Sequence, residues 1–258
     1  FASLLGEEAL SPDTLTQLQA EDDSAILEVN GELIAVEQAE FTVTNTNDSG
    51  EGSLRAAIQQ ANNTDGADTI NFDSNLSGET INVTSNFLTI TDDLTITGLG
   101  AEELTLDAAE SNRLFAIAAE GLEVSMEGLT LTGGTASTSG GAIVNRGNLT
   151  LTEAAITDSS TDSNGGAIVS DGELTLTDSN VSGNSASDDG GGIFNDGGEL
   201  TLTNSTVSGN SASDGGGIFN YYDYDYDDGG QQGQLTLTNS SVSGNSAFRG
   251  GGIYNDGK

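Results

Sequence analysis

A short block that recurs at one fixed distance restricts the fold of this chain more than any other feature. The block reads Gly-Gly-(Ala/Gly)-Ile, followed by Val, Phe or Tyr and then by Asn or Ser, and it occurs five times within residues 140–258. Its isoleucines are Ile143, Ile168, Ile193, Ile218 and Ile253, so the successive spacings are 25, 25, 25 and 35 residues. A fixed period without intervening helical segments predicts a solenoid in which each repeat forms one coil.

Two further motifs share the period. Leu-Thr-Leu-Thr begins at Leu149, Leu174, Leu200 and Leu235, and Val-Ser-Gly-Asn-Ser-Ala begins at Val181, Val207 and Val242. Three short strands per repeat leave no room for the helices of βαβ units, and a hairpin meander would not repeat equivalent residues at one distance. We therefore expect an all-β fold, a parallel β-helix of about 25 residues per coil, with coils paired in register at ~4.8 Å.

In such a fold, equivalent residues of successive coils stack into ladders. The leucines and isoleucines are expected to point inward and the intervening threonines outward, because side chains alternate along a strand. Asparagines at one turn are expected to bond from coil to coil through their amides. The predicted structural ladder comprises Ile143, Ile168, Ile193, Ile218, Ile253, Leu149, Leu174, Leu200, Leu235, Asn184, Asn210 and Asn245.

The first part of the chain lacks this repeat. Ser11-Pro12-Asp13 predicts a short helix to about Gln19, and residues 25–36 predict a β-hairpin around the Asn30-Gly31 turn. Residues 41–44 predict a strand, and Ser53 can cap a helix over residues 54–61 whose apolar positions share one face. We divide the chain into an N-terminal segment 1–40, a candidate assembly arm, and a β-helix over 41–258 with a cap over 41–67 and regular repeats over 140–258.

Two segments carry a family resemblance. The run from Phe41-Thr-Val-Thr through Gly52-Ser53-Leu54-Arg55-Ala56-Ala57-Ile58 resembles the N-terminal cap of large bacterial surface β-helix proteins, with Gly52 and Ala56 in place of that family's Cys and Glu. The Gly-Gly-(Ala/Gly)-Ile blocks resemble half of the repeat of polymorphic outer-membrane proteins, whose other half, Phe-x-x-Asn, is not reproduced. The resemblance covers about 41–258 and implies a right-handed parallel β-helix exposed on, or shed from, a bacterial surface.

Composition excludes several functions. Five Lys and Arg residues against 41 Asp and Glu residues give a net charge of −36, which repels nucleic acids and anionic membranes. Histidine and cysteine are both absent, which removes Cys/His zinc sites, thiol chemistry and His-based triads. No run approaches the ~18 apolar residues of a membrane span. The start at Phe1 without an initiator Met indicates a processed or truncated product, and the composition is typical of an exported bacterial protein.

The residues also argue against catalysis. Polyuronate lyases need clustered cationic groups, and the cations here are scattered: Arg55, Arg113, Arg146, Arg249 and Lys258. Hydrolases need convergent carboxylates. Asp188-Asp189 is the only adjacent pair in the regular coils, and a solvated turn is the simpler interpretation. No cofactor is required; Ca²⁺ is the candidate ligand because Gly/Asp turns offer hard oxygen donors, although no Asp-x-Asp-x-Asp-Gly loop is present.

Three features are candidates for contact. The outward threonines Thr150/Thr152, Thr175/Thr177, Thr201/Thr203 and Thr236/Thr238 resemble the ranks of ice-binding solenoids, but threonine is also simply favoured in strands. An insertion of about ten residues forms a candidate contact loop or a tolerated expansion: Tyr221, Tyr222, Asp223, Tyr224, Asp225, Tyr226, Asp227 and Asp228. A row of Val144, Val169, Phe194, Phe219 and Tyr254 is either an exposed interface or a corner packed under loops.

These observations predict a secreted or cell-surface structural β-helix that acts in self-assembly or adhesion and is not an enzyme. The expected partner is a second copy, in a head-to-tail homopolymer, or a host or matrix surface; nucleic acid and membrane insertion are excluded. The main alternative is a carbohydrate-binding or carbohydrate-cleaving β-helix, which three carboxylates converging in a groove would favour. Ice binding is a further alternative.

Overall fold

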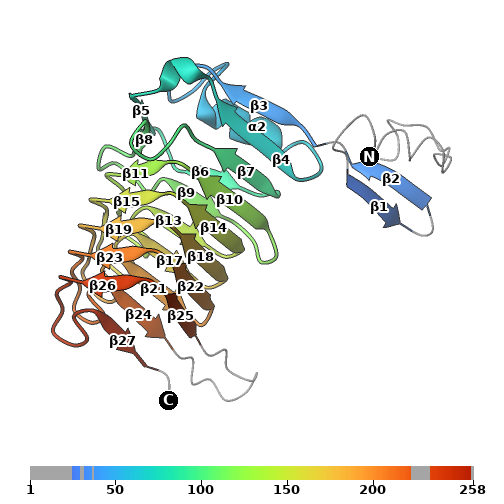
Figure 1. Ribbon diagram of the computed structural model, residues 1–258. Coiled ribbons are helices and arrows are strands. Elements are labelled where there is room, and N and C mark those ends of the chain that lie inside the picture. The colour runs from blue at the N-terminus through green and yellow to red at the C-terminus, as the bar shows by residue number, and fades with distance from the viewer. Residues whose placement is uncertain (1–24, 30–31, 37, 222–232, 257–258) are drawn as a thin grey trace.

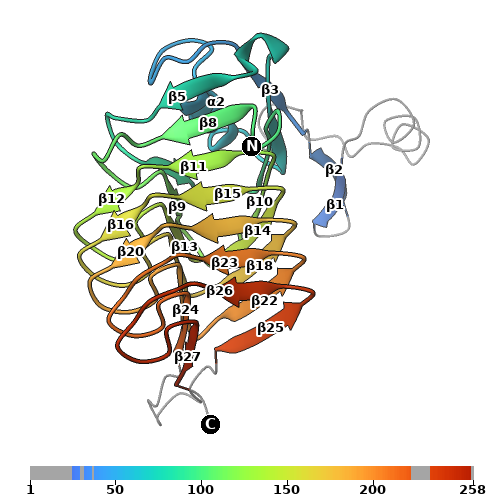
Figure 2. The same cartoon turned by 60° about the vertical axis from the view of Figure 1, so that its left-hand side comes forward.

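The computed structural model describes residues 25–29, 32–36, 38–221 and 233–256. From residue 40 onward the chain winds as a parallel solenoid that advances by one strand spacing per turn (Figure 1). From β4 onward each coil contributes a strand to each of three long sheets, here called sheets I, II and III, and three of the coils add a strand to a short sheet IV (Figure 2). The expected all-β parallel β-helix with about 25 residues per coil is confirmed.

The strands of each sheet follow the order of the coils. Sheet I contains β3 (Glu40–Val43), β4 (Asp68–Phe72), β7 (Leu94–Thr97), β10 (Glu123–Glu127), β14 (Asn148–Thr152), β18 (Glu173–Thr177), β22 (Glu199–Thr203) and β25 (Gln234–Thr238). Sheet II contains β5 (Glu79–Asn82), β8 (Leu104–Asp107), β11 (Thr130–Thr132), β15 (Ala155–Thr157), β19 (Asn180–Ser182), β23 (Thr206–Ser208) and β26 (Ser241–Ser243).

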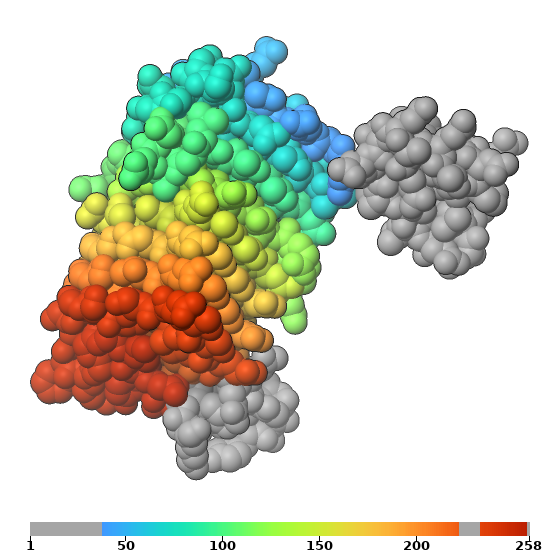
Figure 3. Space-filling model, in the orientation of Figure 1, coloured from blue at the N-terminus to red at the C-terminus, as the bar shows by residue number. Residues whose placement is uncertain are grey.

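Sheet III contains β6 (Leu88–Ile90), β9 (Phe115–Ile117), β13 (Ile143–Asn145), β17 (Ile168–Ser170), β21 (Ile193–Asp196), β24 (Ile218–Tyr221) and β27 (Ile253–Asn255). Sheet IV contains β12 (Thr135–Ala136), β16 (Ser160–Thr161) and β20 (Ser185–Ala186). Within the solenoid every pairing is parallel, and coils lie on one another as successive bands from the N-terminal to the C-terminal end (Figure 3).

The core is a narrow column of stacked aliphatic side chains. Leu149, Leu174, Leu200 and Leu235 lie opposite one another in sheet I, and the isoleucines of the repeated block do the same in sheet III. The ladder leucines and isoleucines are buried up to β24, whereas those of β25 and β27 are only partly buried. Each coil therefore needs few apolar residues, which reconciles a hydrophobic content of 34% with a continuous core.

The coil corners depend on residues in the left-handed backbone region. At the corner between sheets I and II, Glu153, Asp178, Asn204 and Asn239 have φ values of 47°, 50°, 51° and 52°. Glycine fills the same role before sheet III, where Gly165 has φ of 70°. Non-glycine residues pay a conformational cost there, and Asn and Asp tolerate it best, which explains their use at this corner.

A helix closes the N-terminal end. Helix α2 (Leu54–Ala61) begins at Ser53, whose side chain accepts a hydrogen bond from the Ala56 amide, as the sequence predicts. Its buried face consists of Leu54, Ala57, Ile58 and Ala61, and it packs on β3, β4 and β6. A short 3₁₀ helix, η1 (Ser74–Leu76), follows β4.

Arg55 fastens this cap to the first coil. Its guanidinium donates to the Asp48 carboxylate at 2.7 Å and to the Asn86 carbonyl at 2.6 Å. The other Asp48 oxygen accepts from the Ser85 amide at 2.7 Å. Burial by itself would raise the pKa of Asp48, but the hydrogen bonds from Ser85 and Arg55 outweigh it and lower the pKa to about 2.

We expect an acid-sensitive cap. Because the folded-state pKa of Asp48 lies below its ordinary value of 3.8, its stabilising effect is complete above pH 3.8 and is lost as the pH falls towards about 2. Urea midpoints measured from pH 6 to pH 2 should fall less in Asp48→Asn than in the wild type over that interval. Asp65→Asn, a change at an exposed carboxylate of the same region, should follow the wild type. Parallel curves for Asp48→Asn and the wild type would contradict the assignment.

The N-terminal hairpin stands apart from the solenoid sheets. Strands β1 (Ala25–Val29) and β2 (Glu32–Val36) pair antiparallel with each other and with no other described strand. The predicted helix near residues 11–19 and the Asn30-Gly31 turn lie outside the described residues, as do residues 222–232 of the tyrosine-rich insertion.

Candidate interaction surfaces

An asparagine ladder runs through the corner that follows sheet II. The Asn210 Oδ1 accepts from the backbone amide and the Nδ2 of Asn184, at 2.9 and 3.0 Å, and Asn245 accepts in the same way from Asn210. Each buried Nδ2 also donates to a carbonyl of the preceding coil. Asn184 and Asn210 are 1% exposed, so these amides form a polar spine inside the solenoid. The stacking expected for Asn184, Asn210 and Asn245 is thus the arrangement found in the structure.

Two further polar ladders were not assigned from the sequence. One follows sheet I, where the Ser205 Oγ accepts from the Ser179 amide at 3.1 Å and Ser240 accepts from the Ser205 amide. The other ends the strands of sheet III and consists of Asn145, Ser170, Asn195, Asn220 and Asn255. The sequence signal was the Asn or Ser that closes each repeated block, but only the burial of the first four of these side chains shows that they face the core. Asn255, in the last described coil, is exposed.

The sheet III ladder contains one defect, at Ser170. The Asn195 Nδ2 donates to the Asn220 Oδ1 at 2.7 Å, but the Asn195 Oδ1 is buried without a partner. The residue that precedes it in the ladder is Ser170, whose hydroxyl donates to the Gly172 carbonyl instead. A serine is too short to supply the amide donor that an asparagine at this position would offer to Asn195.

We therefore expect Ser170→Asn to stabilise the protein by about 1 kcal/mol, since it supplies a donor to a buried acceptor. The measurement is the free energy of unfolding in urea. Ser208→Asn, an outward-facing change in sheet II, serves as the control and should stay within about 0.5 kcal/mol of the wild type. Destabilisation by Ser170→Asn alone would show that the ladder has no room for the larger side chain.

The aromatic row on the outer side of sheet III is covered. Phe194 and Phe219 are each only 6% exposed and stack with their ring centroids 5.2 Å apart. Tyr221 lies against both rings, at 6.1 and 6.4 Å, and Tyr254 extends the stack beyond Phe219. Of the two interpretations of this row, the packed corner is the one that the structure supports.

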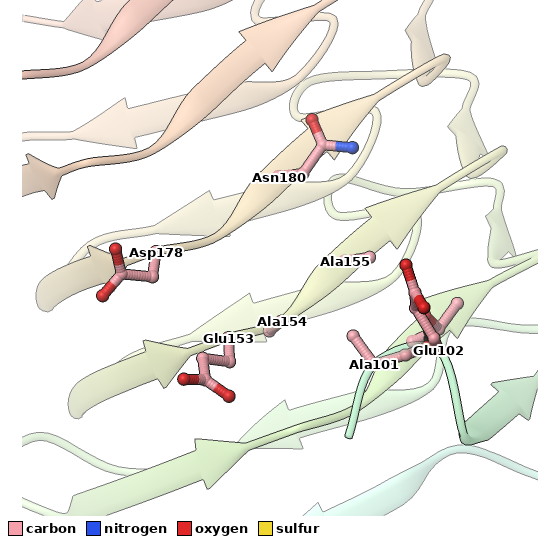
Figure 4. A pocket seen from close by; sticks show the side chains of 8 residues that line it. Ala101, Glu102, Glu153, Ala154, Ala155, Asp178 and Asn180 are labelled. Atoms are coloured by element: carbon pink, nitrogen blue, oxygen red, sulfur yellow. Dashed lines mark hydrogen bonds between the residues drawn. The ribbon is translucent and has the colours of Figure 1, made fainter.

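A shallow hollow of about 360 Å³ lies at the corner between sheets I and II. Glu153 and Asp178 project from equivalent positions of successive coils, and Glu102 lies apart from them on a loop nearer the cap (Figure 4). The spacing between Glu153 and Asp178 follows from the coil repeat, because both residues adopt the same left-handed backbone conformation at the corner.

A larger groove of about 650 Å³ follows the corner between sheets III and I. Four successive turns line it: three supply the acidic residues Glu120, Asp171, Glu173, Asp196 and Glu199, and the other supplies Arg146. Arg146 Nε lies 3.8 Å from the Asp171 carboxylate, and both side chains are about half exposed. Burial raises the pKa of Asp171, an effect that the charge of Arg146 opposes.

Coil stacking also changes the surroundings of the Asp188-Asp189 pair. Asp189 pairs with Asp214 of the next coil and Asp214 with Arg249 of the one after, in a single row. Arg249 donates to both oxygens of Asp214, through Nε at 2.9 Å and through Nη2. Burial raises the pKa of Asp189, and the charges of Asp214 and Asp188 raise it further. Sequence analysis missed Asp214 and Arg249 as neighbours because they are 25 and 60 residues away, although they share one repeat position.

The outward threonines form two ranks in register. Thr150, Thr175, Thr201 and Thr236 lie opposite one another across four strands of sheet I, and Thr152, Thr177, Thr203 and Thr238 form the parallel rank. Those of β14, β18 and β22 are half-buried. The ranks interrupt at β10, where Ser125 and Glu127 occupy the same positions. Ice binding by this face stays a hypothesis.

The described part of the chain contains no dedicated metal-binding site. There, no three acidic side chains are grouped so that they could hold an ion. Of the candidate contact loop only Tyr221 is described, in β24, and Tyr222 to Asp228 lie outside the described residues. Within the same described ranges, none of the helices has the length and apolar character required to cross a bilayer.

The stacked coils and their ladders define a parallel β-helix repeat protein. Residues 178–196 match the Chlamydia polymorphic membrane protein repeat, which confirms over this stretch the resemblance that the glycine-isoleucine blocks carry. The matched segment runs from the corner residue Asp178 through Asn184 to the Phe194-Asn195 pair of β21. No curated protein gives a significant match to the chain. Fold and repeat together fit a surface β-helix repeat protein of bacterial type.

Proposed function

We propose that this chain is a non-catalytic structural β-helix of the bacterial surface, secreted or displayed, that acts through self-assembly or adhesion. The observation that carries the proposal is the uniform register of the coils, because it makes every coil edge a template for another coil. The polymorphic membrane protein repeat supports the placement at the surface. The charge of −36 favours a neutral or cationic partner and disfavours nucleic acid.

The last described coil has strands with a partner on one side and a ladder leucine that is partly exposed. Strands β25, β26 and β27 are the end strands of sheets I, II and III. Leu237 is 40% exposed, although its partner Leu202 in the preceding coil is fully buried. A strand edge of this kind, with apolar ladder residues uncovered, favours the addition of a further strand, whether from the same chain or from a second copy. The hairpin β1–β2, which pairs with no other described strand, is the candidate donor from a second copy.

The experiment compares assembly of the wild type and three variants over a range of concentrations by light scattering and electron microscopy. Leu237→Lys places a charge where a new coil would pack and should leave a monomer, whereas Thr236→Lys, its outward neighbour on β25, should assemble like the wild type. A variant without residues 1–37, which retains β3, tests whether the hairpin is the donor. A wild-type chain that stays monomeric at high concentration would contradict self-assembly and leave adhesion as the proposed role.

A carbohydrate ligand is the second candidate, and the observation that favours it is the acidic groove lined by Asp171, Glu173 and Glu199. Oligosaccharides with amino groups fit its charge better than polyuronates do. Calorimetric titration with neutral, amino and uronic oligosaccharides, together with an assay for released reducing ends, tests both binding and cleavage. Binding that disappears in Asp171→Asn would support this candidate, and an inert groove would remove it.

A further inference from the structure

Asp68 is a buried carboxyl group at the first residue of β4, and it is 1% exposed. Its Oδ1 accepts from the Ala39 amide at 2.8 Å, and the neighbouring Thr69 amide donates to the Ala39 carbonyl at 2.9 Å. Ala39 immediately precedes β3, the first strand of the solenoid. Asp68 therefore holds the chain at the junction between residues 1–38 and the stacked coils.

The second oxygen of the Asp68 carboxyl group loses its hydration on burial, and no described residue compensates for this loss. Oδ2 of Asp68 is buried, and within the described part of the chain it makes no hydrogen bond and Asp68 takes part in no ion pair. A buried carboxylate without a cation is costly, because burial removes its hydration and nothing replaces it.

Among the described residues, the charged groups around Asp68 are acidic. Asp92, in the loop before β7, acts on it through its negative charge. Asp93 accepts from the Asp68 amide through its carbonyl at 3.2 Å, and its own carboxylate is used by the Glu123 amide. Glu40 on β3 accepts from Asn71 on β4. Burial raises the pKa of Asp68, the hydrogen bond from Ala39 lowers it, and Asp92 raises it again; the resulting pKa lies above the ordinary value of 3.8.

We propose that Asp68 is an acid-strengthened latch that fastens β3 to β4. When the group is protonated, it keeps its acceptor for Ala39 and carries no buried charge. When it ionises, the junction holds an unpaired charge next to Asp92, and β3 separates from β4 more readily. The device is independent of what the solenoid binds, and its opening would expose the edge of β4 in sheet I.

The sign of the effect follows from linkage. A carboxyl group whose pKa is higher in the folded than in the unfolded protein stabilises the fold fully below its unfolded pKa, and this contribution is lost as the pH rises through the folded pKa. The latch is thus strongest in acid and weaker at neutral pH. This is the opposite of Asp48, which weakens the cap in acid.

The direct test is the carboxyl titration of Asp68 in the full chain, followed by ¹³C NMR of labelled aspartate and assigned by the resonance that Asp68→Asn removes. We expect a midpoint above 3.8, and Asp92→Asn, which removes the neighbouring charge and leaves Asp68 in place, should lower it. A midpoint at or below 3.8 would overturn the proposal. If Asp68→Asn does not fold, the Asp68 resonance can be assigned instead as the aspartate signal whose midpoint shifts in Asp92→Asn.

Hydrogen exchange of the amides of β3 and β4 tests the consequence. At pH 8, Asp68→Asn should exchange more slowly than the wild type, and the ratio of the two exchange rates should approach one as the pH is lowered towards 4.5. Asp65→Asn, an exposed carboxylate in the turn before β4, should match the wild type at every pH. A ratio that does not change with pH, or faster exchange in Asp68→Asn at pH 8, would show that Asp68 is only a structural acceptor.

Discussion

Replacing Gly166 with alanine is expected to destabilise the solenoid by about 3 kcal/mol or more, because the added methyl group would meet the backbone of the next coil. A Cβ at this position would lie 2.1 Å from the Gly191 carbonyl oxygen and 2.6 Å from the Ser185 carbonyl carbon. The amides of Gly191 and Ser185 donate to the carbonyls of Gly215 and Ser159 in neighbouring coils, so this backbone cannot move without disturbing the stack. The free energy of unfolding in urea, with circular dichroism to verify the fold, measures the effect.

Gly121→Ala separates this steric effect from backbone strain. Gly121 has φ of 78°, but its added Cβ would meet nothing within 4 Å. Its replacement should therefore cost only the conformational penalty of a left-handed alanine, about 1 kcal/mol. If Gly166→Ala cost no more than Gly121→Ala, close approach of the coils would not be the reason for the Gly-Gly block.

Asn210→Ala is expected to cost about 3–4 kcal/mol, the largest effect among the polar ladder residues. The side chain satisfies the Asn184 amide and the Val181 carbonyl, and it also donates to the Asn245 Oδ1 at 3.0 Å. Alanine would leave the Asn184 backbone amide and the Val181 carbonyl without this partner in the core, and each such group costs about 1–3 kcal/mol. The Asn245 Oδ1 would keep its hydrogen bond from the Asn210 backbone amide. The urea midpoint, measured at neutral pH, gives the comparison.

Two variants of the same region sharpen that result. Asn210→Ser should be intermediate, since Ser159 shows that a hydroxyl at this position can accept from the backbone amide of the preceding coil, at 3.2 Å. Asn204→Gly, at an exposed left-handed corner of the same coil, should be neutral or slightly stabilising because glycine relieves the strain at φ of 51°. A cost below about 1 kcal/mol for Asn210→Ala would mean that water or a shifted neighbour replaces the amide.

The local and periodic features of this protein follow from its sequence. The 25-residue spacing of the isoleucine blocks implied the coil, and strand alternation in Leu-Thr-Leu-Thr implied which side chains face the core. The helix at 54–61 was predicted because its cap and its apolar face are both local. The asparagine stack was also accessible, since a ladder in a solenoid requires only that one residue type recurs at one position of the period.

The contacts across coils between different repeat positions were decided only by the tertiary structure. The sequence left open whether Phe194 and Phe219 are exposed. A strand pattern predicts which face of the sheet a side chain lies on, but it does not predict that the Tyr221 ring and the coil corner cover that face. Arg55 meets Asp48 and the loop at Asn86 through loop geometry that no periodicity encodes. The burial of Asp68 was likewise decided only by the tertiary structure. Its cost depends on which groups surround the carboxyl in three dimensions, whereas a repeat fixes only which residues share a row.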